Sequence, residues 1–261
     1  MVKRILPLLA SLLILGLFWQ VLAVVVSNLR GVQFPTPGMT AVVLARLLLG
    51  QTLCQHLVYE HVVDSLGRWI AGFSIAAVLG LAYGMLAGWY RYFELLTTPI
   101  IHVLQLIPGL AWLPVALLVF GISTSATVFM IAITAFCPMA LNVLAGVKRV
   151  DATYIRAARM MGARGSTLLL RVLIPGSLPH AITGLRVGLG NGWRVLVAAE
   201  MIVGSGTGLG YSIIQARWTL DYPSAFACIV IICLIGLVVE QLVFGPLEAR
   251  TVERWGLPRG A

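Results

Sequence analysis

Charged side chains are scarce in this sequence. Asp, Glu, Lys and Arg make up 10% of its 261 residues, hydrophobic residues make up 60%, and the mean hydropathy is +0.98. A soluble domain carries about 25% charged residues because its surface must be solvated. This chain has too few charges to cover a water-facing surface, so the sequence predicts a membrane protein that lies among lipid.

Acidic residues are rarer still, with 9 Asp and Glu against 18 Lys and Arg, giving a net charge of +9. Basic proteins often bind nucleic acid, because they neutralise phosphates. That function needs a basic patch on a soluble face, whereas these arginines stand between long apolar runs. We therefore expect no nucleic-acid partner and attribute the excess to cytoplasmic loops, which retain Lys and Arg.

Motifs for covalent chemistry and for metals are also missing. The cysteines form no CxxC pair, and His102 and His180 have no neighbours at ligand spacing. No nucleophile and base share a motif. The sequence therefore predicts no metal site and no catalytic residues, and the cysteines are expected to be small buried hydrophobic residues, at Cys54, Cys137, Cys228 and Cys233.

Apolar runs long enough to cross a bilayer recur along the chain. A hydrocarbon core about 30 Å thick needs about 20 residues in a helix. These runs predict an all-α integral membrane protein with about six transmembrane helices in a single domain, residues 1–261. The expected spans are Ile5–Ser27, Trp69–Trp89, Ile100–Phe120, Ala126–Gly146, Ala181–Val203 and Ala225–Phe244.

Basic residues outside the apolar runs predict the orientation. If the N-terminus is inside, twelve of the 18 lie on the cytoplasmic side, four lie outside, and Arg186 and Arg194 lie within the fifth run. Among the twelve are three near the C-terminus, Arg250, Arg254 and Arg259. Both ends are therefore expected in the cytoplasm.

Two long connections separate these spans. In the outer one, Pro35 and Pro37 interrupt any helix, and Ala41–Leu49 and His56–Leu66 are expected as short helices outside the membrane or on its surface. The inner one, residues 147–180, is too long and too rich in arginine to be a simple connector.

The inner loop predicts two short helices with a turn between them. Residues 152–161 lack Pro and Gly, and Gly162 is suited to a left-handed turn. Ser166 is expected to cap a second helix, which Pro175 and Pro179 are expected to end before the next span. Such a pair could lie on anionic lipid or enter a groove on a partner protein.

The spacing in this loop resembles the EAA loop of permease subunits from binding-protein-dependent ABC importers. That pattern is Glu-Ala-Ala, three residues, Gly, nine residues, then Ile-x-Leu-Pro. Arg156 stands where the family usually has glutamate, so a contact that needs a negative charge there is not expected. The other matching positions are Ala157, Ala158, Gly162, Val172, Leu173, Ile174 and Pro175.

The resemblance implies a type I ABC importer permease fold in the cell membrane, with the loop docked on an ATPase subunit. The chain lacks Gly-x-x-x-x-Gly-Lys-[Ser/Thr], because neither Lys3 nor Lys148 follows a glycine. We therefore expect no cofactor on this chain, with ATP and Mg on two partner ATPases. The other implied partners are a second permease subunit, expected to be identical, and an extracytoplasmic substrate-binding protein.

Residues 184–201 and 208–211 are most similar to the nitrate/sulfonate/taurine branch of these permeases. That similarity implies import of a small oxyanion by alternating access. A pyrimidine-type heterocycle is an alternative substrate. An ion-gradient-driven transporter is an alternative mechanism, but no paired, inverted halves are apparent in the sequence.

Candidate path residues lie in the fifth span, at Asn191, Trp193 and Arg194. A charge at the bilayer centre costs about 2.5–3.5 kcal/mol on insertion scales, so it usually faces a cavity or a partner. Arg194 could attract an oxyanion or pair with a glutamate on another helix. Glu200 is expected to form a structural pair.

Two glycine series with a spacing of four provide close helix contacts. They are Gly80, Gly84 and Gly88 in the second span and Gly184, Gly188 and Gly192 in the fifth. The first interpretation of these glycines is helix packing within one subunit. The second is a contact that moves, or a seam along the pore.

Overall fold

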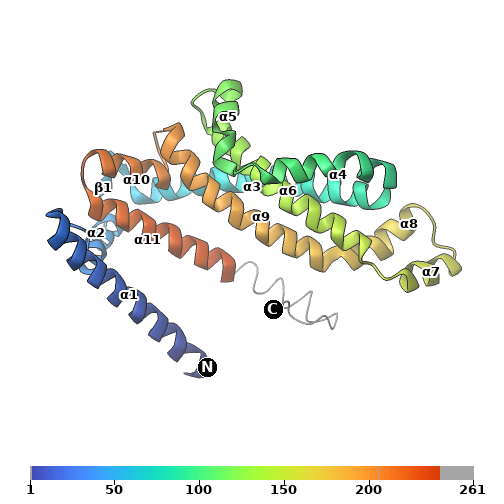
Figure 1. Cartoon of the computed structure of the whole chain (residues 1–261), viewed down its shortest axis with the longest axis horizontal. Helices are drawn as coiled ribbons and strands as arrows, with labels where there is room; N and C mark the ends of the chain where they lie inside the picture. Colours follow the sequence, from blue (N-terminus) through green and yellow to red (C-terminus); the bar gives the residue numbers. More distant parts are fainter. Residues whose placement is uncertain (1, 205, 242–261) are drawn as a thin grey trace.

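The computed structural model describes residues 2–204 and 206–241, and this part of the chain is almost entirely helical (Figure 1). The predicted end of the sixth span at Phe244 lies outside the described residues. So do Arg250, Arg254 and Arg259, so the cytoplasmic position of the C-terminus stays a prediction from the sequence.

Five helices of the described residues are long and apolar enough to cross a membrane, and a bent helix pair could form a sixth span. The prediction of about six transmembrane helices is thereby confirmed. The five are α1 (Val2–Arg30), α3 (Val58–Trp89), α6 (Thr124–Lys148), α9 (Ile174–Val203) and α11 (Tyr222–Val239), and the pair is α4 (Arg91–Leu106) with α5 (Leu113–Phe120).

The third span, predicted at Ile100–Phe120, consists of two helices, α4 and α5. Its two halves are bent by 101°, and a 3-10 turn, η1 (Gly109–Trp112), joins them. Pro108 has no backbone N–H to continue the α4 ladder. Gly109 lets the turn press against the neighbouring helices, since a Cβ there would lie 2.4 Å from Val195 Cγ2.

The outer connection begins as predicted, with a short helix α2 (Pro37–Leu48), and continues through a hairpin of β1 (Thr52–Leu53) and β2 (His56–Leu57). The prediction of a second, separate short helix at His56–Leu66 is wrong. His56 and Leu57 belong to β2, and residues 58–66 form the first turns of α3, where His61 and Ser65 are paired inside the protein, as described below.

Helix α6 forms the centre of the molecule and packs along α3 on one side and α9 on the other (Figure 1). Both glycine series face it. A Cβ on Gly84 would lie 2.5 Å from Val143 Cβ, and a Cβ on Gly188 would lie 2.5 Å from Met139 Cε. The glycines therefore serve close packing within one subunit, as their spacing predicts.

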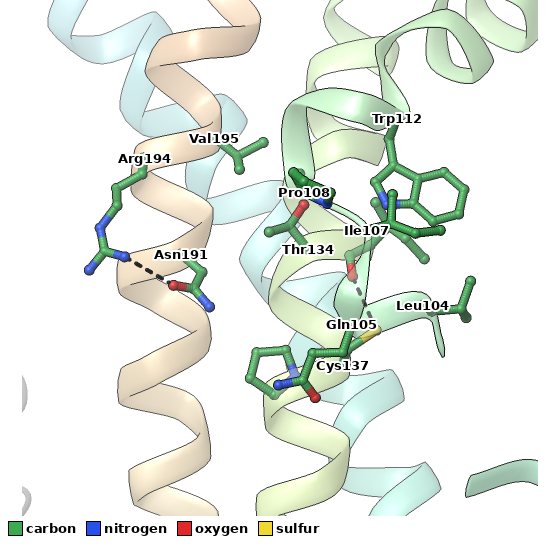
Figure 2. A pocket seen from close by; sticks show the side chains of 13 residues that line it. Leu104, Gln105, Ile107, Pro108, Trp112, Thr134, Cys137, Asn191, Arg194 and Val195 are labelled. Atoms are coloured by element: carbon green, nitrogen blue, oxygen red, sulfur yellow. Dashed lines mark hydrogen bonds between the residues drawn. The ribbon is translucent and has the colours of Figure 1, made fainter. Parts of the chain in front are cut away.

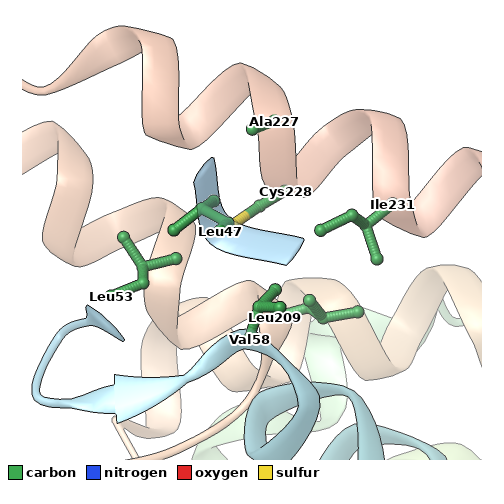
Figure 3. Close-up of a cluster of buried hydrophobic side chains, with 7 residues drawn as sticks. All are labelled: Leu47, Leu53, Val58, Leu209, Ala227, Cys228 and Ile231. Carbon is green, nitrogen blue, oxygen red and sulfur yellow. The ribbon is translucent and has the colours of Figure 1, made fainter. Parts of the chain in front are cut away.

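A cluster of buried hydrophobic side chains holds the ends of the helices together near the hairpin (Figure 3). It joins α2, the hairpin, the start of α3, α10 (Leu209–Trp218) and α11. Its buried members are Leu47, Leu53, Val58, Leu209, Ala227, Cys228 and Ile231. Helix α1 adds a peripheral contact, since the Trp19 and Phe226 rings stack with centroids 5.6 Å apart.

Replacing Gly188 with Val should destabilise the protein, because the new side chain would overlap Met139 and approach the carbonyl oxygen of Ala135. Overpacking of this kind costs about 1–3 kcal/mol of unfolding free energy. The measurement is thermal unfolding of the purified protein in lipid nanodiscs. Gly190→Val is the matched control, since a Cβ there has Arg194 Nη2 as its nearest neighbour, at 3.9 Å. Equal loss in both variants would contradict the packing role of the series.

Candidate translocation cavity and coupling loop

A cavity of about 280 Å³ opens where α4 breaks, between α4, α6 and α9 (Figure 2). Figure 2 shows Asn191 and Arg194 on α9, and Gln105 and Thr134 on the side of α4 and α6. The break at Pro108 creates this space, because a straight helix would continue through it. Two of the three predicted path residues, Asn191 and Arg194, therefore line one cavity.

Among the described residues that line the cavity, Arg194 alone is charged. Its Nη1 donates a hydrogen bond to Asn191 Oδ1 at 3.2 Å, and no carboxylate of the described residues lies within ion-pair distance of it. Two other arginines near the spans differ. Arg68 pairs with Glu200, and Arg186 pairs with Glu240. Of these three arginines, Arg194 alone lacks an ion pair within the described chain.

Thr134 adds an unsatisfied polar group to the same wall. Its Oγ1 is buried and has no hydrogen-bond partner among the described residues. An unpaired buried hydroxyl costs about 1–3 kcal/mol, so a polar ligand that reaches Thr134 would recover part of that cost.

Trp193 lies away from the cavity. It is 9% exposed, and its ring lies 4.9 Å from that of Trp69 in the core between α3 and α9. Helix geometry explains the difference, because Asn191, Arg194 and Val195 share one face, whereas Trp193 falls on another. This periodicity is visible in the sequence and separates Trp193 from the other two candidates.

A second hollow of about 450 Å³ adjoins the first and shares Gln105 and Pro138 with it. His102, Leu106, Leu141 and Asn142 complete its lining. The two hollows follow the surface of α6 from Thr134 to Asn142, toward the inner loop.

Glu200 and Arg68 form an ion pair near the end of α9 that lies away from the loop. Glu200 is fully buried, and its Oε1 accepts a hydrogen bond from Arg68 Nη1 at 2.7 Å. Ser65 Oγ donates to the same carboxylate at 2.9 Å, and the Gly210 amide donates at 3.0 Å. The expectation of a structural pair for Glu200 is confirmed, with a partner that the sequence assigned to the outer loop.

His61 extends this cluster to the hairpin. Its Nε2 lies 2.9 Å from the Leu53 carbonyl oxygen, and its Nδ1 accepts from the Gly208 amide at 3.0 Å. Arg68 also donates to the carbonyl oxygen of Thr207, at 2.8 Å. The cluster therefore ties α3, α9 and the 206–210 turn together. Sequence reasoning missed it, although His61, Ser65 and Arg68 recur with helical spacing.

The inner loop contains the first of its predicted helices, α7 (Ala152–Met160). Asp151 caps it by accepting a hydrogen bond from the Thr153 amide at 2.7 Å, and this bond lowers the pKa of the Asp151 carboxyl. Ala158 is buried against the protein, while Arg156 on the same helix is exposed. Gly162 makes the predicted turn, with φ of +87°.

The second half of the loop differs from the prediction. Gly165, with φ of +51°, precedes a single turn, α8 (Ser166–Leu168), so Ser166 is the first helical residue rather than the cap. A π-helical turn, η2 (Leu169–Leu173), which contains Val172, then leads directly into α9. Pro175 does not end the helix, because it lies in the first turn of α9, where no backbone N–H is needed.

Residues 71–244 match the family described as binding-protein-dependent transport system inner membrane component. The chain belongs to this family. It is therefore a multi-pass membrane protein and a transport component, and its residues Ile174 and Pro175 stand at the junction of the inner loop and α9.

Curated relatives support the same assignment. A putative ABC transporter permease of Methanocaldococcus jannaschii is 38% identical over 85% of this chain and 82% of its own length. The taurine transport system permease protein TauC of Escherichia coli is 36% identical over 70% of this chain and 66% of its own. The nitrate import permease protein NrtB of Synechocystis is 35% identical, with the same coverage. These relatives confirm the predicted nitrate/sulfonate/taurine branch.

A solved structure confirms the predicted type I permease fold. A chain of the MetNI methionine ABC transporter, in an inward-facing conformation, superposes with a TM-score of 0.61 and 19% identity. The match covers 74% of this chain and 95% of that chain.

Glu200→Gln should cost about 3–5 kcal/mol of unfolding free energy, because it leaves the buried Arg68 guanidinium without a counter-charge. Thermal unfolding in nanodiscs measures the loss. Adding Arg68→Met to Glu200→Gln should recover part of it, since the unpaired charge is then absent. A double variant less stable than Glu200→Gln would contradict the charge argument.

Proposed function

We propose that this permease moves a small oxyanion through the cavity at Arg194, as one half of an ATP-driven importer. The observation that supports this proposal is that Arg194 has no ion-pair partner among the described residues, although it lies on a membrane-spanning helix beside a cavity. At such depth an arginine usually faces a partner or a water-filled space. An anion in transit would supply the missing charge.

The chemistry of the wall favours oxygen-rich anions. A guanidinium presents several N–H donors in a plane and can bind two oxygens of one anion. Thr134 supplies a hydroxyl, and the amides of Gln105 and Asn191 supply further polar groups. Relatives of this chain are named for nitrate, bicarbonate and taurine, each of which carries an oxyanion group.

Coupling to ATP is assigned to the inner loop. Helix α7 exposes Arg156 and Met160 on the molecular surface while Ala158 anchors it to the protein. The proposal places this helix in a cleft of a partner ATPase, which binds ATP and Mg. Because α8, η2 and α9 follow one another without a break, a displacement of α7 that passes through the turn at Gly162 would reach the helix that carries Arg194.

The complete importer in this proposal has two permease subunits, expected to be identical, two ATPases and an extracytoplasmic binding protein. Closure of the ATPases would open the pore outward, and hydrolysis would return it inward. The chain itself would hold no cofactor.

Arg194→Gln should lower anion uptake by at least about tenfold, corresponding to ~1.4 kcal/mol of lost stabilisation. The measurement is uptake by the reconstituted importer with its binding protein, across nitrate, bicarbonate, alkanesulfonates, taurine and thiamine-precursor pyrimidines. Arg186→Gln is the control, because Arg186 lies on the same helix but pairs with Glu240. Uptake of a neutral pyrimidine alone would refute the oxyanion assignment.

Gly162→Pro should uncouple ATP hydrolysis from uptake while the protein still inserts in the membrane. Proline cannot adopt the φ of +87° found at Gly162, so the turn after α7 must change. Gly31→Pro is the matched control, since Gly31 also follows a helix, with φ of +61°, at the end of α1. Normal coupled uptake by Gly162→Pro would contradict the role of the loop.

A further inference from the structure

Neither hollow beside α6 has a carboxylate among the described residues that line it. Their charged and hydrogen-bonding side chains are a guanidinium, an imidazole, an indole, a thiol, a hydroxyl and amides. These side chains belong to Arg194, His102, Trp112, Cys137, Thr134, Gln105, Asn142 and Asn191.

Every Asp and Glu in the described part of the chain is engaged elsewhere. Some form ion pairs, and the others accept hydrogen bonds from nearby hydroxyl or amide groups. The interactions are Glu60 with His56, Asp64 with Thr207, Glu94 with Lys148, Asp151 with Thr153, Glu200 with Arg68, Asp221 with Ser224, and Glu240 with Arg186.

The neutral acceptors along the hollows are partly occupied as well. Asn191 Oδ1 accepts from Arg194, and the Pro138 carbonyl oxygen accepts from Asn142 Nδ2 at 2.7 Å. A cationic group passing here would find no charged partner on the described walls, and Arg194 would repel it.

We propose that these hollows select simple monoanions and discriminate against zwitterions that carry an ammonium group beside the oxyanion. This inference rests on the proposed oxyanion function and narrows its substrate class. Nitrate, bicarbonate and unsubstituted alkanesulfonates fit the class. An aminosulfonate such as taurine does not, although one relative of this chain is named for it.

The test compares two sulfonates of equal size. Taurine and propane-1-sulfonate differ by an ammonium in place of a methyl group. The full chain, assembled with its ATPases in nanodiscs and without binding protein, is incubated with radiolabelled propane-1-sulfonate, and unlabelled competitors displace it at neutral pH. Omitting the binding protein removes its own selectivity from the result. We expect propane-1-sulfonate to compete at least about tenfold better than taurine, with nitrate and bicarbonate also competing.

A carboxylate added to the wall should change this preference. Gln105 lines both hollows, so Gln105→Glu would place a negative charge on the route. It should raise the affinity for taurine relative to propane-1-sulfonate by about tenfold. Gln105→Met is the matched control, which removes the amide without adding charge and should leave the preference for propane-1-sulfonate in place.

The outcomes separate the two proposals. Taurine competing as well as propane-1-sulfonate, or no change of preference in Gln105→Glu, would overturn the discrimination against zwitterions and leave the oxyanion function intact. No specific binding of labelled sulfonate and no uptake of any anion would overturn the oxyanion function itself. If Arg194→Gln left sulfonate binding unchanged, neither the oxyanion function nor the discrimination against zwitterions could be assigned to this cavity.

Discussion

The close approach of three helix backbones is the constraint on which the rest of this structure depends. Helix α6 packs between glycine series on α3 and α9, where added Cβ atoms would overlap its side chains. In lipid, hydrophobic burial contributes little to helix association, so packing contacts must hold the helices together. The cavity, the ion pair and the inner loop are all placed by elements of this three-helix unit.

Given this packing, each polar group at membrane depth needs its own compensation. Arg68 and Glu200 neutralise each other, and Ser65 and the Gly210 amide donate further hydrogen bonds to the Glu200 carboxylate. Arg186 is paired with Glu240. Arg194 has an amide oxygen as its partner, and it is the group that stands at a cavity. The contrast between paired and unpaired arginines supports the proposal that Arg194, rather than Arg68 or Arg186, carries a functional charge.

Much of this arrangement is predictable from the sequence, because lipid imposes simple rules on length, charge and close packing. The apolar runs predict the spans, and the glycine spacing predicts the contact faces. The bend at Pro108 is less predictable, since a proline can kink a helix or end it. The part of α3 that lies N-terminal to Trp69 cannot be predicted from the sequence for another reason. His61, Ser65 and Arg68 resemble a surface segment until Glu200 and the 206–210 turn are brought beside them.

The continuity of α9 links features that are far apart in space. Its first turn follows the inner loop through η2, its middle carries Asn191 and Arg194, and its far end carries Glu200. Since the glycine series presses α9 against α6 over several turns, α9 cannot bend easily in its middle. A shift imposed at the loop would therefore move the cavity wall and the buried ion pair together. Under the proposed mechanism, the ion pair would resist displacement of the outer end of α9. Movement of the ATPases would then tilt α9 as a whole, and this tilt, rather than a local distortion of α9, would change the cavity.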